Sequence, residues 1–96
     1  METTEYFSID IFCSHHGVDI AFVRSLGEYG LVEITEISSQ YMIPITQLAA
    51  AEKMTRLYLD LQVNPEGIDI IFNLMEKIQT MRSEITNLQN RLSLYE

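Results

Sequence analysis

The chain has 96 residues, of which 47% are hydrophobic, and a formal net charge of −8. This length predicts one small domain with an appended element, and the composition excludes a disordered chain. No apolar run approaches the roughly 18 residues that span a bilayer, and residues 1–10 lack the basic and apolar regions of a signal peptide. The single cysteine, Cys13, cannot form an internal disulfide. We therefore expect a soluble cytoplasmic protein.

The acidic excess is concentrated in the first half of the chain. Residues 1–50 contain seven acidic side chains and one basic side chain, Arg24, whereas residues 51–96 contain seven acidic and five basic ones. Binding to phosphates depends on several Lys or Arg contacts and on the counterions that they release. The first half therefore suits a basic protein surface better than a nucleic acid.

Two short helices are predicted near the N-terminus. Ser8 can cap a helix over residues 9–15, and Gly17 can end it. Asp19 can cap a second helix, which ends at Gly30. The second helix carries an apolar stripe of Ile20, Phe22, Val23 and Leu26. This order is typical of a helix-turn-helix, whose second helix usually enters the major groove of DNA.

A β-hairpin is predicted next, followed by a third helix. Val32 and Ile34 alternate with acidic residues in its first strand, and Tyr41 begins the return strand after a Ser-Ser-Gln tip. Pro44 blocks continuation of that strand, and Thr46 can cap the third helix. The third helix covers residues 47–62, with an apolar face of Leu48, Ala51, Met54 or Thr55, Leu57, Tyr58 and Leu61.

The last helix carries the strongest periodic pattern. Asn64 can cap it, and Pro65 occupies its first position, where the missing N–H costs little. Apolar residues then follow in alternating steps of three and four: Ile71, Leu74, Ile78, Met81, Ile85, Leu88, Leu92 and Tyr95. This a/d heptad pattern predicts a helix that pairs with a second copy. The alternatives are that the stripe packs on a neighbouring helix of the same chain or binds another partner. The pattern divides the chain into a helix-turn-helix domain over residues 1–62 and a dimerisation helix over residues 63–96.

The order of helix, turn, helix, wing, connecting helix and terminal helix resembles the MerR superfamily. Within it, RLYLDLQVNPEGIDIIFNLM and the EITNLQNRL tail resemble the CbpM-type chaperone modulators, a likeness that extends over about residues 6–95. The resemblance implies a mainly α fold, a MerR-like winged helix-turn-helix with a small β-hairpin wing and a long C-terminal dimerisation helix. It also implies a non-enzymatic adaptor that binds the J-domain of a DnaJ/CbpA-like co-chaperone and lowers its activity. J-domains present a basic helix to their chaperone.

The residues predicted to bind the partner lie at the end of the second helix, in the wing and near the last helix junction. They are Arg24, Glu28, Tyr29, Glu33, Glu36 and Asp60. The three glutamates cluster at the end of the second helix and along the first wing strand, where they can meet a basic helix. Asp60, Glu66 and Asp69 form a second candidate patch, and tyrosine is a favoured anchor in interfaces. A MerR-type DNA-binding regulator is the alternative function, and a scaffold that acts only through its coiled coil is a third.

Cys13, His15 and His16 suggest a metal site, but a closed zinc site needs about four ligands and the chain has no other Cys or His. Cys13 also falls on the apolar face of its helix. Adjacent residues on one short helix rarely align a nucleophile, its base and an orienting group. We therefore predict no metal, no cofactor and no catalytic residue.

Overall fold

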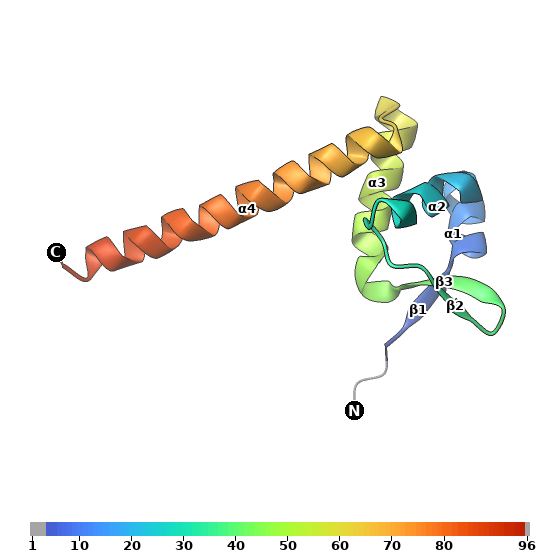
Figure 1. Ribbon diagram of the computed structural model, residues 1–96, viewed down its shortest axis with the longest axis horizontal. Helices are drawn as coiled ribbons and strands as arrows, with labels where there is room; N and C mark the ends of the chain where they lie inside the picture. Colours follow the sequence, from blue (N-terminus) through green and yellow to red (C-terminus); the bar gives the residue numbers. More distant parts are fainter. Residues whose placement is uncertain (1–3, 96) are drawn as a thin grey trace.

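The computed structural model describes residues 4–95, which form four α-helices, three strands and one 3-10 turn. In chain order these are β1 Tyr6–Ser8, α1 Ile9–His16, α2 Ile20–Glu28, β2 Thr35–Ile37, β3 Gln40–Pro44, the 3-10 turn Ile45–Gln47, α3 Leu48–Leu61 and α4 Pro65–Ser93. Figure 1 shows α1–α3 and the sheet grouped at one end of the long helix α4. This mainly α arrangement, with its small antiparallel sheet, confirms the predicted winged helix-turn-helix fold.

Local capping sets the bounds of α1 and α2. Ser8 Oγ accepts a hydrogen bond from the backbone N–H of Ile11 at 3.4 Å. Gly17 ends α1 at φ 68°, and Gly30 follows α2 at φ 73°, a left-handed conformation that glycine adopts at little cost. These predictions are confirmed. Asp19 occupies the predicted N-cap position of α2, but its side chain makes no capping hydrogen bond.

The sheet has the order β1-β3-β2, with both pairings antiparallel. β1 is absent from the sequence-based prediction, which has only the hairpin. The hairpin itself is confirmed, and β3 ends at Pro44 as expected. Its first strand, however, begins at Thr35 and excludes Val32 and Ile34. Val32 is buried in the core, and the backbone N–H of Glu33 donates to the side chain of Gln47 at 2.8 Å, so this segment is held without strand pairing.

The start of α3 also differs from the prediction. Thr46 does not cap the helix, because it lies within the 3-10 turn and Gln47 occupies the N-cap position. The side-chain oxygen of Gln47 accepts from Glu33, and Gln47 makes no capping bond of its own. At the other end of α3, Leu61 is exposed, although it was predicted to face the core. Leu61 belongs to the last turn, which leads into the connection to α4.

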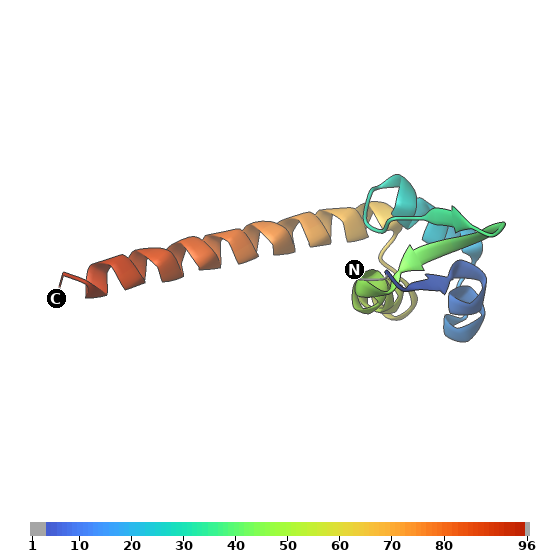
Figure 2. The ribbon, with the colours of Figure 1, turned by 90° about the horizontal axis from the view of Figure 1, so that it is seen from below.

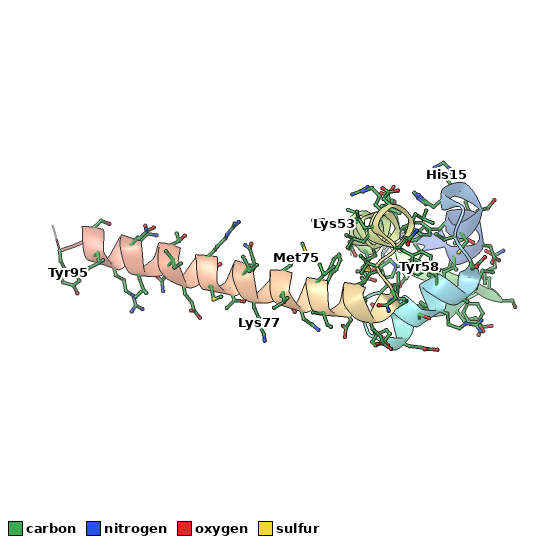
Figure 3. All side chains as sticks on the ribbon, turned by 90° about the horizontal axis from the view of Figure 1, so that it is seen from above. His15, Lys53, Tyr58, Met75, Lys77 and Tyr95 are labelled. Carbon is green, nitrogen blue, oxygen red and sulfur yellow. The ribbon has the colours of Figure 1, made fainter. Side chains whose placement is uncertain are left out.

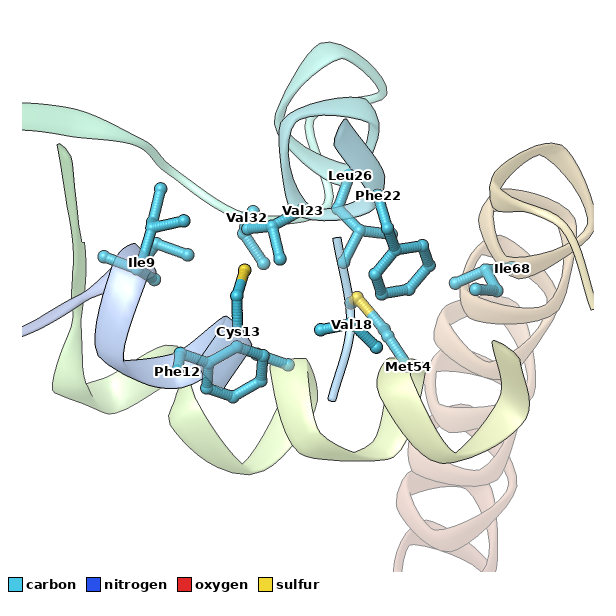
Figure 4. Packing of buried hydrophobic residues seen from close by; sticks show 12 residues of the cluster. Ile9, Phe12, Cys13, Val18, Phe22, Val23, Leu26, Val32, Met54 and Ile68 are labelled. Atoms are coloured by element: carbon cyan, nitrogen blue, oxygen red, sulfur yellow. The ribbon is translucent and has the colours of Figure 1, made fainter. Parts of the chain in front are cut away.

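The hydrophobic core lies between the helix-turn-helix, the sheet, α3 and the first turns of α4. Leu26, Ile43, Met54 and Ile68 are its most completely buried apolar side chains. Figure 4 shows Ile68 directed at the core side chains from α2 and α3. Asn64 Oδ1 accepts from Gly67 N at 2.8 Å, which confirms the predicted cap of α4. The beginning of α4 is therefore fixed to the domain by both a cap and core packing.

Most of α4 projects away from the domain. The helix has 29 residues, which at 1.5 Å per residue makes it about 44 Å long. The Cα radius of gyration is 17.4 Å, whereas a compact chain of this length would have about 12 Å. Figure 2 shows the sheet and the other helices at one end, with the rest of α4 extending beyond them. None of the described helices is long and apolar enough to cross a membrane.

Candidate interaction surfaces

The acidic side chains of the first half are on the surface. Six of them lie within the described residues, and all six are exposed: Glu5, Asp10, Asp19, Glu28, Glu33 and Glu36. Arg24 is the one cation of residues 1–50 and is also exposed. The winged domain therefore presents an acidic surface, with a single guanidinium on the exposed side of α2.

The three predicted glutamates lie on three different segments of the chain. Glu36 lies in β2, opposite Tyr41 of β3. Glu33 lies before the strand, in the segment held by Gln47. Glu28 ends α2, beside Tyr29, and the chain reverses at Gly30 before it reaches the wing. Of the three, only Glu36 therefore lies on a wing strand.

Tyr29 belongs with the start of α4. Partial desolvation, followed by Glu66, Asp69 and Glu28, raises the pKa of the Tyr29 phenol above its ordinary value. Tyr29 and Asp69 also line a groove of about 460 Å³ between the segment that follows α2 and the helices α3 and α4. The structure thus brings Tyr29 together with two acids of the second predicted patch. Asp60 is exposed, and it makes no hydrogen bond or ion pair within residues 4–95.

Arg24 lines a second groove, of about 570 Å³, between the first turn of α1, α2 and the wing. Ile20, Ile34 and Tyr41 contribute apolar surface to it. Ile20 belongs to the predicted apolar stripe of α2, and it is 45% exposed, whereas the other three members of the stripe are buried. The sequence analysis did not identify this groove. One sequence signal could have identified it: Ile20 and Arg24 are four residues apart, and residues at this spacing share one face of a helix.

The predicted dimerisation seam is exposed along nearly its whole length. Ile71 is half-buried against the domain. The other seven seam residues are exposed by 48% to 89%: Leu74, Ile78, Met81, Ile85, Leu88, Leu92 and Tyr95. Figure 3 shows the side chains of α4 beyond Met75 with no other element beside them. The alternative that this stripe packs on another helix of the same chain is therefore wrong from Leu74 onward.

Cys13 and His16 of α1 pack against other side chains of the domain. Cys13 is buried, His16 Nε2 lies 3.7 Å from Glu52 Oε2, and the His16 ring packs on Phe12 with centroids 4.4 Å apart. Within residues 4–95, no three His, Cys, Asp or Glu side chains are grouped so that they could hold a metal ion. The contact between His16 and Glu52 joins α1 to α3, and the sequence analysis did not anticipate it.

We expect Cys13 to be unreactive toward a disulfide reagent such as DTNB in the native protein. Burial, and then the charges of Asp10 and Asp19, raise the pKa of the thiol, so little thiolate forms near neutral pH. Because the sulfur is accessible only when the core opens, modification should be about 10³-fold slower than in guanidinium. Absorbance of the released thiolate measures the rate, with the denatured protein as the control. A native rate close to the denatured rate would contradict the burial of Cys13.

Comparison with known proteins places this fold in a family. Residues 7–90 match the family described as MerR HTH family regulatory protein. No curated protein matches the chain. The match includes both helices of the helix-turn-helix, the wing, α3 and nearly all of α4. The chain therefore belongs to the MerR helix-turn-helix family of regulatory proteins.

Proposed function

We propose that this protein is a non-enzymatic, dimeric adaptor that binds the basic helix of a J-domain in a DnaJ/CbpA-like co-chaperone. The observation that carries the proposal is the exposed acidic surface of the winged domain, in which Arg24 is the single cation of residues 1–50. A basic partner is attracted to such a surface, and complementary charge increases both the association rate and the specificity. The choice of a J-domain protein rests on the resemblance to the CbpM-type modulators.

The same surface disfavours DNA. A protein that contacts six to ten phosphates uses a comparable number of Lys or Arg side chains. Here α2, the helix that would enter the groove, carries Arg24 alone and ends in Glu28. On the wing, Glu33 and Glu36 are exposed where they would repel phosphates. Family membership keeps DNA binding as the second candidate function, so the two are tested side by side.

The proposed dimer forms through α4. Its exposed seam is a continuous a/d stripe, and monomeric proteins rarely leave such a long apolar stripe in water. A helix that is unsupported beyond its first turns is also marginally stable in water. Pairing with a second copy would cover the seam and stabilise the helix, and it would leave the winged domains free to bind the partner.

Charge reversal on the wing tests the acidic surface. In a Glu33→Lys/Glu36→Lys variant, we expect affinity for the J-domain protein to fall about 10- to 100-fold and its salt dependence to weaken, because a rim of attractive charge becomes repulsive. Isothermal titration at low and moderate salt measures both effects. Glu28→Lys, tested separately, shows whether the end of α2 contributes.

The matched control is Glu76→Lys/Glu84→Lys, which makes the same charge change on α4. Its dimer mass is checked by light scattering, and it should bind nearly as the unmodified protein does. Absence of J-domain binding at micromolar concentrations in low salt would refute the proposal. Tight sequence-specific DNA binding in a gel-shift assay at low salt would instead support the second candidate.

A further inference from the structure

The groove between the first turn of α1, α2 and the wing is lined by apolar side chains that the fold covers only in part. Tyr41 and the fully buried Ile43 are two residues apart on β3, so their side chains point to the same face. Ile43 is covered, whereas Tyr41 is 52% exposed. On the opposite side, Ile20 is 45% exposed. Two large apolar side chains thus face the groove with half of their surface in water.

The wing tip holds one rim of this groove in a strained turn. Ser38 and Ser39 form a two-residue hairpin turn with φ values of 52° and 65°. Turns of this kind normally contain Asn-Gly or Asp-Gly, because the left-handed conformation costs an ordinary L-residue about 1 kcal/mol. Ser39, Gln40 and Tyr41 all line the groove. Strain of this type is concentrated in segments that bind other molecules.

The charges around the groove select the kind of ligand. Arg24 lies one turn after Ile20 on α2, and it forms no ion pair within residues 4–95. Its planar guanidinium can bind one carboxylate through two hydrogen bonds. Asp10 also lines the groove, and Glu36 lies opposite Tyr41 in the sheet. These two carboxylates would repel a ligand with several negative charges, such as a nucleic acid.

We propose that this groove binds a peptide segment of a partner protein that carries an apolar side chain next to a single carboxylate. The apolar side chain packs between Ile20, Ile34 and Tyr41, and the carboxylate pairs with Arg24. A volume of about 570 Å³ is within the range of sites that bury a ligand side chain. Tyrosine and arginine are also the residue types that carry most of the energy in protein interfaces.

The test uses two blocked dipeptides as probes, N-acetyl-Leu-Glu-amide and N-acetyl-Leu-Gln-amide, with the full chain labelled for NMR. We expect millimolar binding of the Glu peptide, with amide shifts confined to the residues of α1, α2 and the wing that line the groove. The Gln peptide should bind about three- to fivefold more weakly, because a partly exposed charge pair contributes little more than this.

Two variants separate the roles of the two side chains. Arg24→Gln should remove the difference between the peptides, and Tyr41→Ala should weaken both peptides equally. Arg56→Gln, an exposed substitution on α3 outside the groove, is the control and should change neither affinity. The proposal is overturned if no shifts appear at millimolar peptide, if they lie elsewhere, or if Arg24→Gln still distinguishes the two peptides. Wild-type J-domain binding is measured in parallel, so the failure of one proposal is distinguished from that of the other.

Discussion

Replacing Ile85 with glutamate is expected to convert the proposed dimer into monomers. Ile85 lies near the middle of the seam, so a parallel and an antiparallel pairing would both bury it. In the dimer the substitution places two carboxylates in an apolar interface, which costs about 3–5 kcal/mol in total. The dissociation constant should therefore rise by about two to four powers of ten. Sedimentation equilibrium over a range of protein concentrations measures this change.

The matched control is Asn87→Glu, which adds the same charge two residues later, outside the a/d seam. It should leave the dimer mass unchanged. The Ile85→Glu monomer should also lose part of its helical circular dichroism, because the end of α4 is marginal without a partner, while the winged domain stays folded. A monomeric wild type, or an Ile85→Glu variant as dimeric as the wild type, would show that the seam does not form the dimer.

The helices could be predicted because their signals are local. Asn64 and Pro65, two consecutive residues, mark the start of α4, and the heptad pattern continues along the helix without interruption. Gly17 and Gly30 likewise mark the ends of α1 and α2 by their backbone conformation. Each of these features depends on residues within one or two turns of the helix, so the sequence alone is sufficient.

The sheet could not be predicted in full, because its strand pairings join residues that are far apart in the sequence. β1 has three residues and therefore no useful periodicity, and its identity as a strand comes from pairing Phe7 with Ile43. The late start of β2 has a similar cause, since Gln47 holds the backbone of Glu33 from across the wing. Neither the strand pairing nor the hydrogen bond to Gln47 leaves a pattern in the local sequence.

The candidate interaction surfaces could likewise be predicted from the sequence only in part. The net charge of the first half is a property of composition, so the acidic surface could be predicted. The placement of its members could not, because Glu33 lies before β2 in a segment that is held by Gln47. Ile20 shows a further limit: it belongs to the apolar stripe of α2, yet it is 45% exposed and lines the groove beside the wing. The type of surface was therefore more predictable than the positions of the residues that form it.

The second large effect is expected for Ile68→Ala, which removes a side chain that is 0% exposed in the first turns of α4. Deleting a buried isoleucine in this way costs about 2–5 kcal/mol, because the cavity is only partly filled by relaxation. For a domain of this size, the melting temperature should fall by about 10–25 °C. Thermal and urea unfolding, followed by circular dichroism, measure the change. Both are recorded at one fixed protein concentration, because the proposed dimer would make stability depend on concentration.

Ile11→Ala is the matched control for this core substitution, since it makes the same chemical change at a side chain that is 72% exposed. Its effect should stay within about 0.5 kcal/mol. If Ile68→Ala unfolds in two separate transitions, the first turns of α4 detach before the winged domain melts, and Ile68 then serves mainly to dock the helix. If it unfolds as stably as Ile11→Ala, then Ile68 does not join α4 to the core. Ile68 is buried in the same core cluster as Met54 of α3 and Phe22 of α2. We therefore expect Ile68→Ala to unfold in a single transition at a lower temperature.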